Sequence, residues 1–315
     1  MRRLRSYSIE LFLVIVLAGA VGFFAYLGYG LLSPSLTAEP FSGEQALRYA
    51  VEQTEFGDRI TGTEPNIRAG DWIIEQLREQ GWDVIIQPFT INGTPARNIV
   101  AIQGGGGIAN QRVALLTTHY DSRVYADRDP QVANHIQPAG GANAGASGVG
   151  VLLELGRTLD VALTGHTVCM VFLDAEDNGG LEGWPANGGA QIFLSRFEED
   201  FPRCVGPRFA VHVAQVGGLE QEFYAAGESD PALQTSIWQI SQEQGYVGWR
   251  VQSSGEGLIN THVRFREQGI PAIAIAGLNY PYRHTIADTV DKLSAQAMEQ
   301  IGRTLKTWLE RGAPF

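Results

Sequence analysis

The fold of this chain is decided by two segments, Val113-Ala114-Leu115-Leu116-Thr117-Thr118-His119-Tyr120-Asp121-Ser122 and Gly140-Gly141-Ala142-Asn143-Ala144-Gly145-Ala146-Ser147-Gly148. The apolar start of the first segment predicts a buried strand, and the residues after the second, Val149 to Leu155, predict a core-facing helix. A His-x-Asp pair at a strand end, here His119 and Asp121, indicates a metal site. We expect such a site to take its next ligand from the glycine-rich loop, where the sequence has Ala144.

Outward from these segments, strand-like and helix-like patterns alternate along the chain. Strands are expected at 82–89, 98–103, 113–117, 166–173, 209–216, 248–252 and 271–276, and helices at 41–54, 66–80, 148–159, 190–197, 231–244, 262–268 and 294–311. The first two strands, separated by turn residues, predict a hairpin. The alternation predicts a single α/β domain whose central sheet is mostly parallel and has helices on both faces.

The N-terminal segment has the pattern of a membrane anchor. Leu11 to Leu32 is 22 residues without a charge, and Arg2, Arg3 and Arg5 precede it. This length suits a transmembrane helix, and the arginines predict a cytoplasmic end at 1–10. A linker at 33–40 then leads to an extracytoplasmic domain at 41–315. A long signal peptide cleaved after Ala38 is the alternative, and it also exports the domain.

The composition excludes some partners and leaves the redox state open. The chain has 315 residues, of which 44% are hydrophobic, enough for one large domain with a sizeable core. The formal net charge is −11, and basic residues cluster only in the first five, so nucleic acid is not an expected partner. Cys169 lies in an apolar run and is most simply a buried thiol, although a bridge to Cys204 is possible.

Polar side chains follow four of the expected strands, where parallel sheets gather their working residues. They are His119 and Asp121, then Asp174, Glu176 and Asp177, then His212 and Gln215, and finally His284 and Asp288. Zinc-dependent hydrolysis needs His and carboxylate ligands and a carboxylate base, and an adjacent Glu-Asp pair can supply a ligand and the base. Taken singly, each group also has a purely structural explanation. His119 could cap a loop, Asp174 to Asp177 could form a solvated turn, and His284 could pack beside Tyr280 and Tyr282.

In this order, the groups resemble those of the M28 zinc exopeptidases, whose relatives include the glutaminyl cyclases. The resemblance spans roughly residues 41–311 and rests on His119-Tyr120-Asp121-Ser122, the glycine-rich loop, Asp174-Ala175-Glu176-Asp177 and Tyr280-Pro281-Tyr282-Arg283-His284-Thr285, with Arg59-Ile60-Thr61-Gly62-Thr63 upstream. It implies a zinc-peptidase fold with one or two zinc ions. It also implies that His119 binds one zinc and that Asp121 orients it. Glu176 is then the general base, and Asp177 and His284 bind the second zinc.

The chain departs from this family at two expected ligands. The family has Asp in the glycine-rich loop and at the end of the fourth strand, and the matching residues here are Ala144 and Ala214. A methyl group cannot coordinate zinc, and a catalytic zinc normally has about three protein ligands. His212 could substitute as a ligand, and so could Asn143, although an amide oxygen is a poor zinc ligand. Thr261 also falls where many members carry an acidic residue.

Three functions therefore remain open. The first is a membrane-anchored zinc peptidase that removes N-terminal residues from peptides, with Glu176 activating a metal-bound water. The second is a catalytically degenerate homologue whose cleft binds a peptide or a partner protein, as Ala144 and Ala214 suggest. The third is an acyltransferase like the glutaminyl cyclases, which needs the same ligand that Ala144 lacks. Peptide or protein N-termini are the partners that the resemblance implies.

Overall fold

The computed structural model describes residues 14, 16–21, 39–104, 112–250 and 261–315. The chain divides into two units, Met1–Glu39 and Pro40–Phe315, and the second contains the sheet and its core. Most of the expected membrane segment, 11–32, lies outside the described residues. Within the described ranges, no helix combines the length and the apolar character that crossing a membrane requires.

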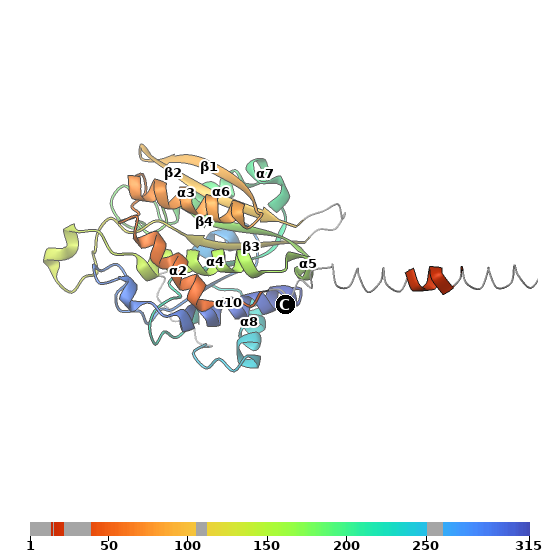
Figure 1. Ribbon diagram of the computed structural model, residues 1–315. Helices are drawn as coiled ribbons and strands as arrows, with labels where there is room; N and C mark the ends of the chain where they lie inside the picture. The colour runs from red at the N-terminus through yellow and green to blue at the C-terminus, as the bar shows by residue number, and fades with distance from the viewer. Residues whose placement is uncertain (1–13, 15, 22–38, 105–111, 251–260) are drawn as a thin grey trace, which may run out of the picture. The chain divides into compact units, whose positions relative to one another are not determined.

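A seven-stranded sheet in the order β1-β2-β4-β3-β5-β7-β6 forms the centre of the second unit (Figure 1). The strands are β1 (Asp83–Ile91), β2 (Thr94–Gln103), β3 (Arg112–His119), β4 (His166–Leu173), β5 (Pro207–Val213), β6 (Tyr224–Ala225) and β7 (Ala272–Ala276). The central strands β4, β3, β5 and β7 pair in parallel, whereas β1, β2 and β6 pair antiparallel. The expected α/β class is therefore confirmed, and its parallel part is the middle of the sheet.

Apolar side chains alternate between the two faces of the central strands, because successive residues of a strand point to opposite sides. In β4, Val168, Met170 and Phe172 join one core cluster, and Cys169, Val171 and Leu173 join the other. Nearly continuous apolar strands of this kind occur where helices cover both faces of a sheet. The core is thus double, with one apolar layer on each side of the sheet.

Helices cover both layers. They are α2 (Gly43–Thr54), α3 (Glu64–Glu79), α4 (Ser147–Thr158), α5 (Val161–Thr164), α6 (Gly188–Ser195), α7 (Phe197–Asp200), α8 (Pro231–Glu243), α9 (Thr261–Glu267) and α10 (Ala295–Glu310), with short turns η1 (Val132–Ile136), η2 (Ala142–Ala146), η3 (Pro202–Cys204) and η4 (Val290–Lys292). Helices α2, α4 and α10 pack against one another, and α6 packs against α9 (Figure 1). Ser42 caps α2 as its sequence predicts, accepting a hydrogen bond from the Gln45 N–H at 3.2 Å.

Most sequence-predicted elements are confirmed, and the differences have local causes. The hairpin of β1 and β2 turns at Asn92 and Gly93, both with positive φ. The strand expected at 248–252 is reduced, among the described residues, to a bridge between Trp249 and Phe223, and 251–252 lie outside the described residues. Strand β6 was not predicted, because two residues show no periodicity.

The interpretation of Cys169 as a free thiol was wrong. Cys169 and Cys204 form a disulfide with their Cα atoms 6.2 Å apart, and both residues are fully buried. The bridge ties the middle of β4 to η3, in the core layer that contains Phe193, Phe201 and Phe265. Sequence alone could not decide this pairing, since two cysteines carry no spacing pattern.

Candidate functional site

The carboxyl ends of the four parallel strands surround a pocket of about 310 Å³. Its lining includes the sequence-predicted groups His119, Glu176, Asp177, His212 and His284, and both alanines, Ala144 and Ala214. Candidate residues from four separate parts of the chain therefore meet in one place. Ala175, Gln215 and His284 have φ near +57°, a strained conformation that costs a non-glycine residue roughly 1–2 kcal/mol and is common at functional sites.

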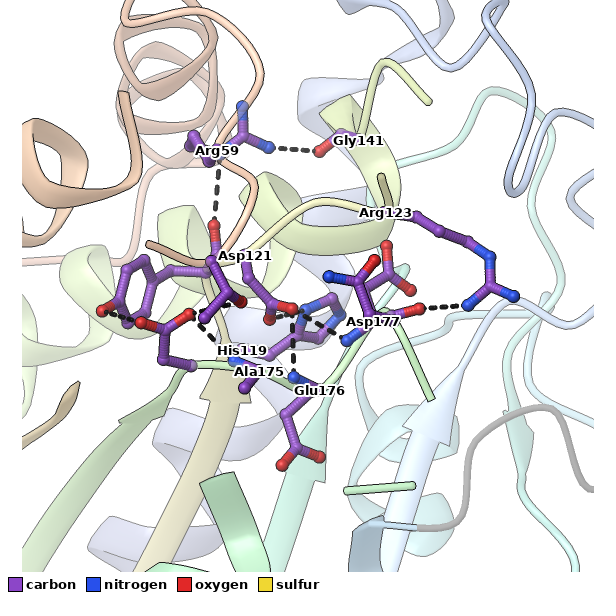
Figure 2. A network of polar contacts seen from close by, with 12 residues as sticks. Arg59, His119, Asp121, Arg123, Gly141, Ala175, Glu176 and Asp177 are labelled. Carbon is purple, nitrogen blue, oxygen red and sulfur yellow. Dashed lines mark hydrogen bonds and ion pairs between the residues drawn. The ribbon is translucent and has the colours of Figure 1, made fainter. Parts of the chain in front are cut away.

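Asp121 organises the floor of the pocket (Figure 2). Its Oδ2 accepts the N–H groups of Glu176 and Asp177 at 3.0 and 2.9 Å, and its Oδ1 lies 3.2 Å from Nδ1 of His119. Asp121 thus orients His119, the role that the resemblance implies for it. Burial opposes charge on His119, but the hydrogen bond and charge of Asp121, together with the charges of Asp177 and Glu176, raise its pKa to about 9.

Glu176 lies beside this network, and its side chain points away from Asp121 in Figure 2. Its Oε1 accepts the Ala190 N–H at 2.8 Å, and its Oε2 accepts from the Thr261 hydroxyl at 2.8 Å and the Asn187 amide at 3.2 Å. Burial raises the pKa of Glu176 above its ordinary value, although the hydrogen bonds from Ala190 and Thr261 oppose this shift. Asn187 was not predicted from sequence, because its place in a long glycine-rich loop reveals nothing of its partner.

Asp177 and His284 form a buried pair in the lining of the pocket. Oδ1 of Asp177 lies 2.9 Å from Nε2 of His284, and the other carboxylate oxygen, Oδ2, has no hydrogen-bond partner among the described residues. Burial alone would raise the pKa of Asp177, but the charge and hydrogen bond of His284 hold it below its ordinary value. His284 therefore lines the pocket, and the rings of Tyr280 and Tyr282 contact each other.

The acidic run after β4 is not the solvated turn that remained possible from sequence. Asp174 is fully buried and accepts hydrogen bonds from Thr61, Asn66 and Tyr120 at 2.9, 3.1 and 3.0 Å. Burial raises the pKa of Asp174 to about 6. Asp174 therefore ties the loop after β4 to the helix α3 region, and it does not line the pocket.

The glycine-rich loop is held close to the ends of β3 and β5. A Cβ on Gly145 would lie 2.5 Å from the Asp121 carbonyl oxygen, and one on Gly148 would lie 2.4 Å from that of Val213, so only glycine fits. Asp288 accepts the backbone N–H groups of Asn143 and Ala144 at 2.8 and 3.1 Å. These contacts fix Ala144 at the pocket wall, where its side chain is a methyl group.

The second alanine lies at the end of β5. Ala214 is 3% exposed and lines the pocket beside His212 and Gln215. Nδ1 of His212 lies 2.9 Å from the Thr117 hydroxyl, and burial holds the pKa of His212 well below its ordinary value. Asn143, the other possible substitute, donates from its backbone to Asp288 and accepts the Gly217 N–H at 2.7 Å through Oδ1. Asn143 is therefore a structural residue of the loop.

The described residues do not fit the zinc centre that the resemblance implies. Within 39–104, 112–250 and 261–315, no group of three or more His, Cys, Asp or Glu side chains is arranged to hold a metal ion. Asp177 and His284 are close enough to share a metal, but Ala144 supplies no third donor, and His119 has Ala214 in place of a carboxylate. A catalytic zinc normally has about three protein ligands, so each candidate position falls short.

Four charged residues of the pocket were missed by sequence reasoning, and three of them are arginines. Arg123, Asp127, Arg128 and Arg283 line the pocket. Arg123 donates to both carboxylate oxygens of Asp127 at 2.7 Å. It also donates to the backbone carbonyl of Asp177 (Figure 2). A pocket rich in guanidinium groups is not what a two-zinc site needs. No pattern in the sequence distinguishes these arginines from arginines on the surface, so sequence analysis could not identify them as pocket residues.

Solved structures share the fold over most of the chain. A Zn-dependent exopeptidase from Parabacteroides distasonis is similar with a TM-score of 0.77 and 25% identity, over 87% of this chain and 99% of the other. Glutaminyl cyclase from Porphyromonas gingivalis is similar with a TM-score of 0.75 and 30% identity, over 86% of this chain and 99% of the other.

Sequence comparison agrees with the structural similarity. A probable zinc metalloprotease of Leptosphaeria maculans is 27% identical over 181 residues, which are 49% of this chain and 40% of that protein. This chain therefore matches less than half the length of that relative. Residues 98–309, which include every sequence-predicted pocket residue, match the description of peptidase family M28. The chain belongs to peptidase family M28.

Proposed function

We propose that this protein is a catalytically degenerate M28 homologue whose cleft binds a peptide segment of a partner without hydrolysing it. The observation that carries the proposal is the pair of methyl groups, Ala144 and Ala214, on the pocket wall where the family has carboxylates. Loss of two carboxylate ligands removes most of the affinity for a metal pair, because the ligands supply both the bonds and the compensating negative charge.

The state of Glu176 supports the same proposal. A general base must be within reach of the water that it activates, and both oxygens of Glu176 are already occupied by donors from Ala190, Thr261 and Asn187. Ala144 and Ala214 also offer no oxygen to hold a metal ion that would lower the pKa of a water molecule to near neutrality. The residues are therefore better suited to holding a ligand than to cleaving one.

A zinc-dependent exopeptidase is the second candidate, and one observation favours it. His119, Glu176, Asp177 and His284 line one pocket, in the arrangement that the family resemblance implies. In that case zinc would be the cofactor and peptide N-termini the substrates. A glutaminyl-cyclase-like acyltransferase is favoured by the similarity to the Porphyromonas gingivalis enzyme, but it needs the carboxylate that Ala144 lacks.

One experiment separates these functions. The full-length chain is purified in detergent, its zinc content is measured, and it is tested on aminoacyl chromogenic substrates and on peptides with N-terminal glutamine. The same measurements are made on Ala144→Asp with Ala214→Asp. The matched control is Ala186→Asp, which adds a carboxylate to the same pocket at a position that corresponds to no expected ligand.

We expect no stoichiometric zinc and no turnover in the unmodified chain, and zinc binding in the double variant alone. The double variant would bind zinc because each metal position regains a carboxylate. Chelator-sensitive cleavage of any of these substrates by the unmodified chain would overturn the proposal and leave the peptidase or the cyclase in its place. Zinc binding by Ala186→Asp would show that any added carboxylate suffices, which would contradict the assigned positions.

We also propose that residues 11–32 anchor the protein in a membrane and that 41–315 lies on the extracytoplasmic side. The uncharged length of this segment and the arginines before it support a single-pass orientation. The disulfide between Cys169 and Cys204 supports export, because such bonds persist in oxidising compartments. Protease accessibility of the domain in intact cells tests the orientation, and digestion only after lysis would contradict it.

A further inference from the structure

A second cavity, of about 550 Å³, lies at the other end of the parallel strands. Its walls come from three parts of the chain, residues 194–199, 205–207 and 268–270, and we call it the second groove. Strands β5 and β7 begin beside this groove, whereas the candidate site lies at their carboxyl ends. The length of β5 places the two cavities about 20 Å apart.

The floor of the second groove is apolar and continuous with the core. Phe197 belongs to the core layer that contains the disulfide, and Leu194 and Ile270 pack against that layer. Val205, on the wall, is 40% exposed. The neighbouring Cys204 is bridged to β4, which ties this wall to the sheet. A partly exposed apolar surface inside a cavity of this size is typical of a binding site.

The rim of the second groove carries negative charge. Glu198 and Glu199 on α7 are exposed, and neither forms an ion pair with another described residue. Helix α6 ends at the groove, and the carbonyl groups at the C-terminus of a helix add partial negative charge. Arg196, which also lines the groove, is held by Asp200 at 3.0 Å and by the Pro88 carbonyl oxygen at 3.4 Å.

Three further arginines lie on neighbouring segments and do not line the groove. Arg203 is paired with a carboxylate on β1, whereas Arg208 and Arg266 donate to backbone carbonyl oxygens. Of the charged groups in the groove lining, only Glu198 and Glu199 lack a partner of opposite charge among the described residues. Charge complementarity at the groove itself therefore favours a cation.

We propose that the second groove binds a basic and partly apolar peptide segment of a partner protein. Apolar side chains of the segment lie on the floor, and its lysine or arginine side chains face Glu198 and Glu199. A volume of about 550 Å³ accommodates a few residues of an extended segment. The inference goes beyond the proposed function, since it assigns a second binding surface at the opposite end of the sheet.

Calorimetric titration of the full-length chain in neutral detergent, with a detergent-only blank, tests this proposal. The probes are three tetrapeptides with both ends blocked, Leu-Lys-Leu-Lys, Ser-Lys-Ser-Lys and Leu-Glu-Leu-Glu. The first is expected to bind at least about tenfold more tightly than either of the others, because it alone combines apolar and positive groups. Raising the salt concentration from about 50 mM to about 500 mM should weaken its binding, since exposed charges are screened. Equal binding of the three peptides, or no binding of the first, would overturn the inference.

Variants then assign the contacts. Glu198→Gln with Glu199→Gln is expected to weaken binding about fivefold and to remove most of its dependence on salt. Val205→Ser should weaken binding at every salt concentration, because it removes an apolar contact and no charge. The matched control is Glu75→Gln with Glu79→Gln, a pair of exposed glutamates on α3 that should leave binding unchanged. Unaltered binding by both groove variants, with the melting temperature retained, would contradict the assignment.

Two further measurements separate this inference from its alternatives. Sedimentation in the same detergent tests a second copy as the occupant, and dimer formation that Val205→Ser abolishes would overturn a partner segment. Ala144→Asp with Ala214→Asp should bind the Leu-Lys-Leu-Lys peptide as the unmodified chain does, because both positions lie at the other end of β5. Loss of binding in that variant would place the peptide in the candidate site and overturn the inference, whereas cleavage of substrates by the unmodified chain would overturn only the proposed function.

Discussion

Oδ1 of Asp177 lies 2.9 Å from Nε2 of His284, and these two buried side chains join the loop after β4 to the loop after β7. In the family resemblance the same two residues are ligands of one zinc ion. Here Ala144 offers no third donor, and Nε2 of His284 also accepts a hydrogen bond from Nε of Arg283 at 3.2 Å. Two donors alone do not make a catalytic zinc site, so the stability of the chain should be insensitive to metal.

The first prediction concerns metal removal. Dialysis of the full-length chain against a chelator should change its melting temperature by no more than about 1 °C, because a ligand stabilises a protein only when it binds the folded state. Calorimetry before and after dialysis, and after zinc is returned, measures this. The Ala144→Asp, Ala214→Asp variant is the comparison, and zinc should raise its melting temperature by several degrees. A clear fall on chelation in the unmodified chain would show that it holds a stabilising metal.

The second prediction concerns Asp288, which fixes the glycine-rich loop. Its carboxylate accepts two backbone N–H groups, from Asn143 and Ala144, and the Tyr280 hydroxyl at 2.7 Å. Asp288→Asn should lower the free energy of unfolding by about 2 kcal/mol, because it replaces a charged acceptor by an amide that can accept through one atom only. Tyr280→Phe removes one of these bonds and should cost about 1 kcal/mol.

Chemical unfolding measures both changes, and Asp291→Asn serves as the control. Asp291 is exposed on η4, three residues from Asp288, and its substitution should alter the free energy of unfolding by less than about 0.5 kcal/mol. Equal effects of Asp288→Asn and Asp291→Asn would show that the loop is held by packing alone.

The third prediction concerns the disulfide. Cys169 and Cys204 are 35 residues apart, and closing a loop of this length stabilises the folded state by about 3–4 kcal/mol in the chain-entropy account. Cys169→Ala with Cys204→Ala should therefore lower the free energy of unfolding by about 3 kcal/mol. Chemical unfolding of the oxidised protein, the reduced protein and the variant checks this. If the reduced protein and the oxidised protein unfold at the same denaturant concentration, the bridge contributes nothing.

Much of the fold could be predicted because each central strand carries its own pattern. The apolar run 166–173 predicted β4 with the bounds that the structure shows, and glycine and asparagine marked the turn between β1 and β2. Strand β6 could not be predicted, since its pairing with β7 depends on where the preceding loop places it. The disulfide could not be predicted for the same reason, because it depends on the approach of η3 to β4 and not on any local pattern.

The site was only half predictable for a similar reason. His119 ends β3, Glu176 and Asp177 come soon after β4, and His284 lies in the loop after β7, so the topology of the sheet brings them together. Asn187 and Thr261 donate hydrogen bonds to Glu176. They lie on segments that come close to Glu176 only in the folded chain, so the sequence does not reveal these contacts. The arginines were missed because guanidinium groups reach the pocket from loops of irregular structure.

The fourth prediction concerns pH and depends on His262, a buried residue of α9. Its Nε2 lies 2.7 Å from the Gly227 carbonyl oxygen, and its Nδ1 has no hydrogen-bond partner among the described residues. Burial lowers the pKa of His262 from 6.5 to about 4, while the hydrogen bond to Gly227 opposes this shift. The unfolded chain therefore binds more protons than the folded chain between pH 4 and 6.5. Stability is complete above pH 6.5 and falls as the pH drops through this window, by up to about 3 kcal/mol at pH 4.

Chemical unfolding at several values between pH 8 and pH 4 measures this slope, and His262→Asn removes the contribution of His262 to it. The variant is expected to be less stable than the parent at pH 8, because asparagine does not fill the same space, yet to lose less stability on acidification. His135→Asn on η1, outside the core, is the control and should keep the slope of the parent. The change in slope is the decisive quantity, since a purely structural defect at His262 would lower the free energy of unfolding equally at every pH. Parallel curves for parent and His262→Asn would therefore refute a neutral, buried His262.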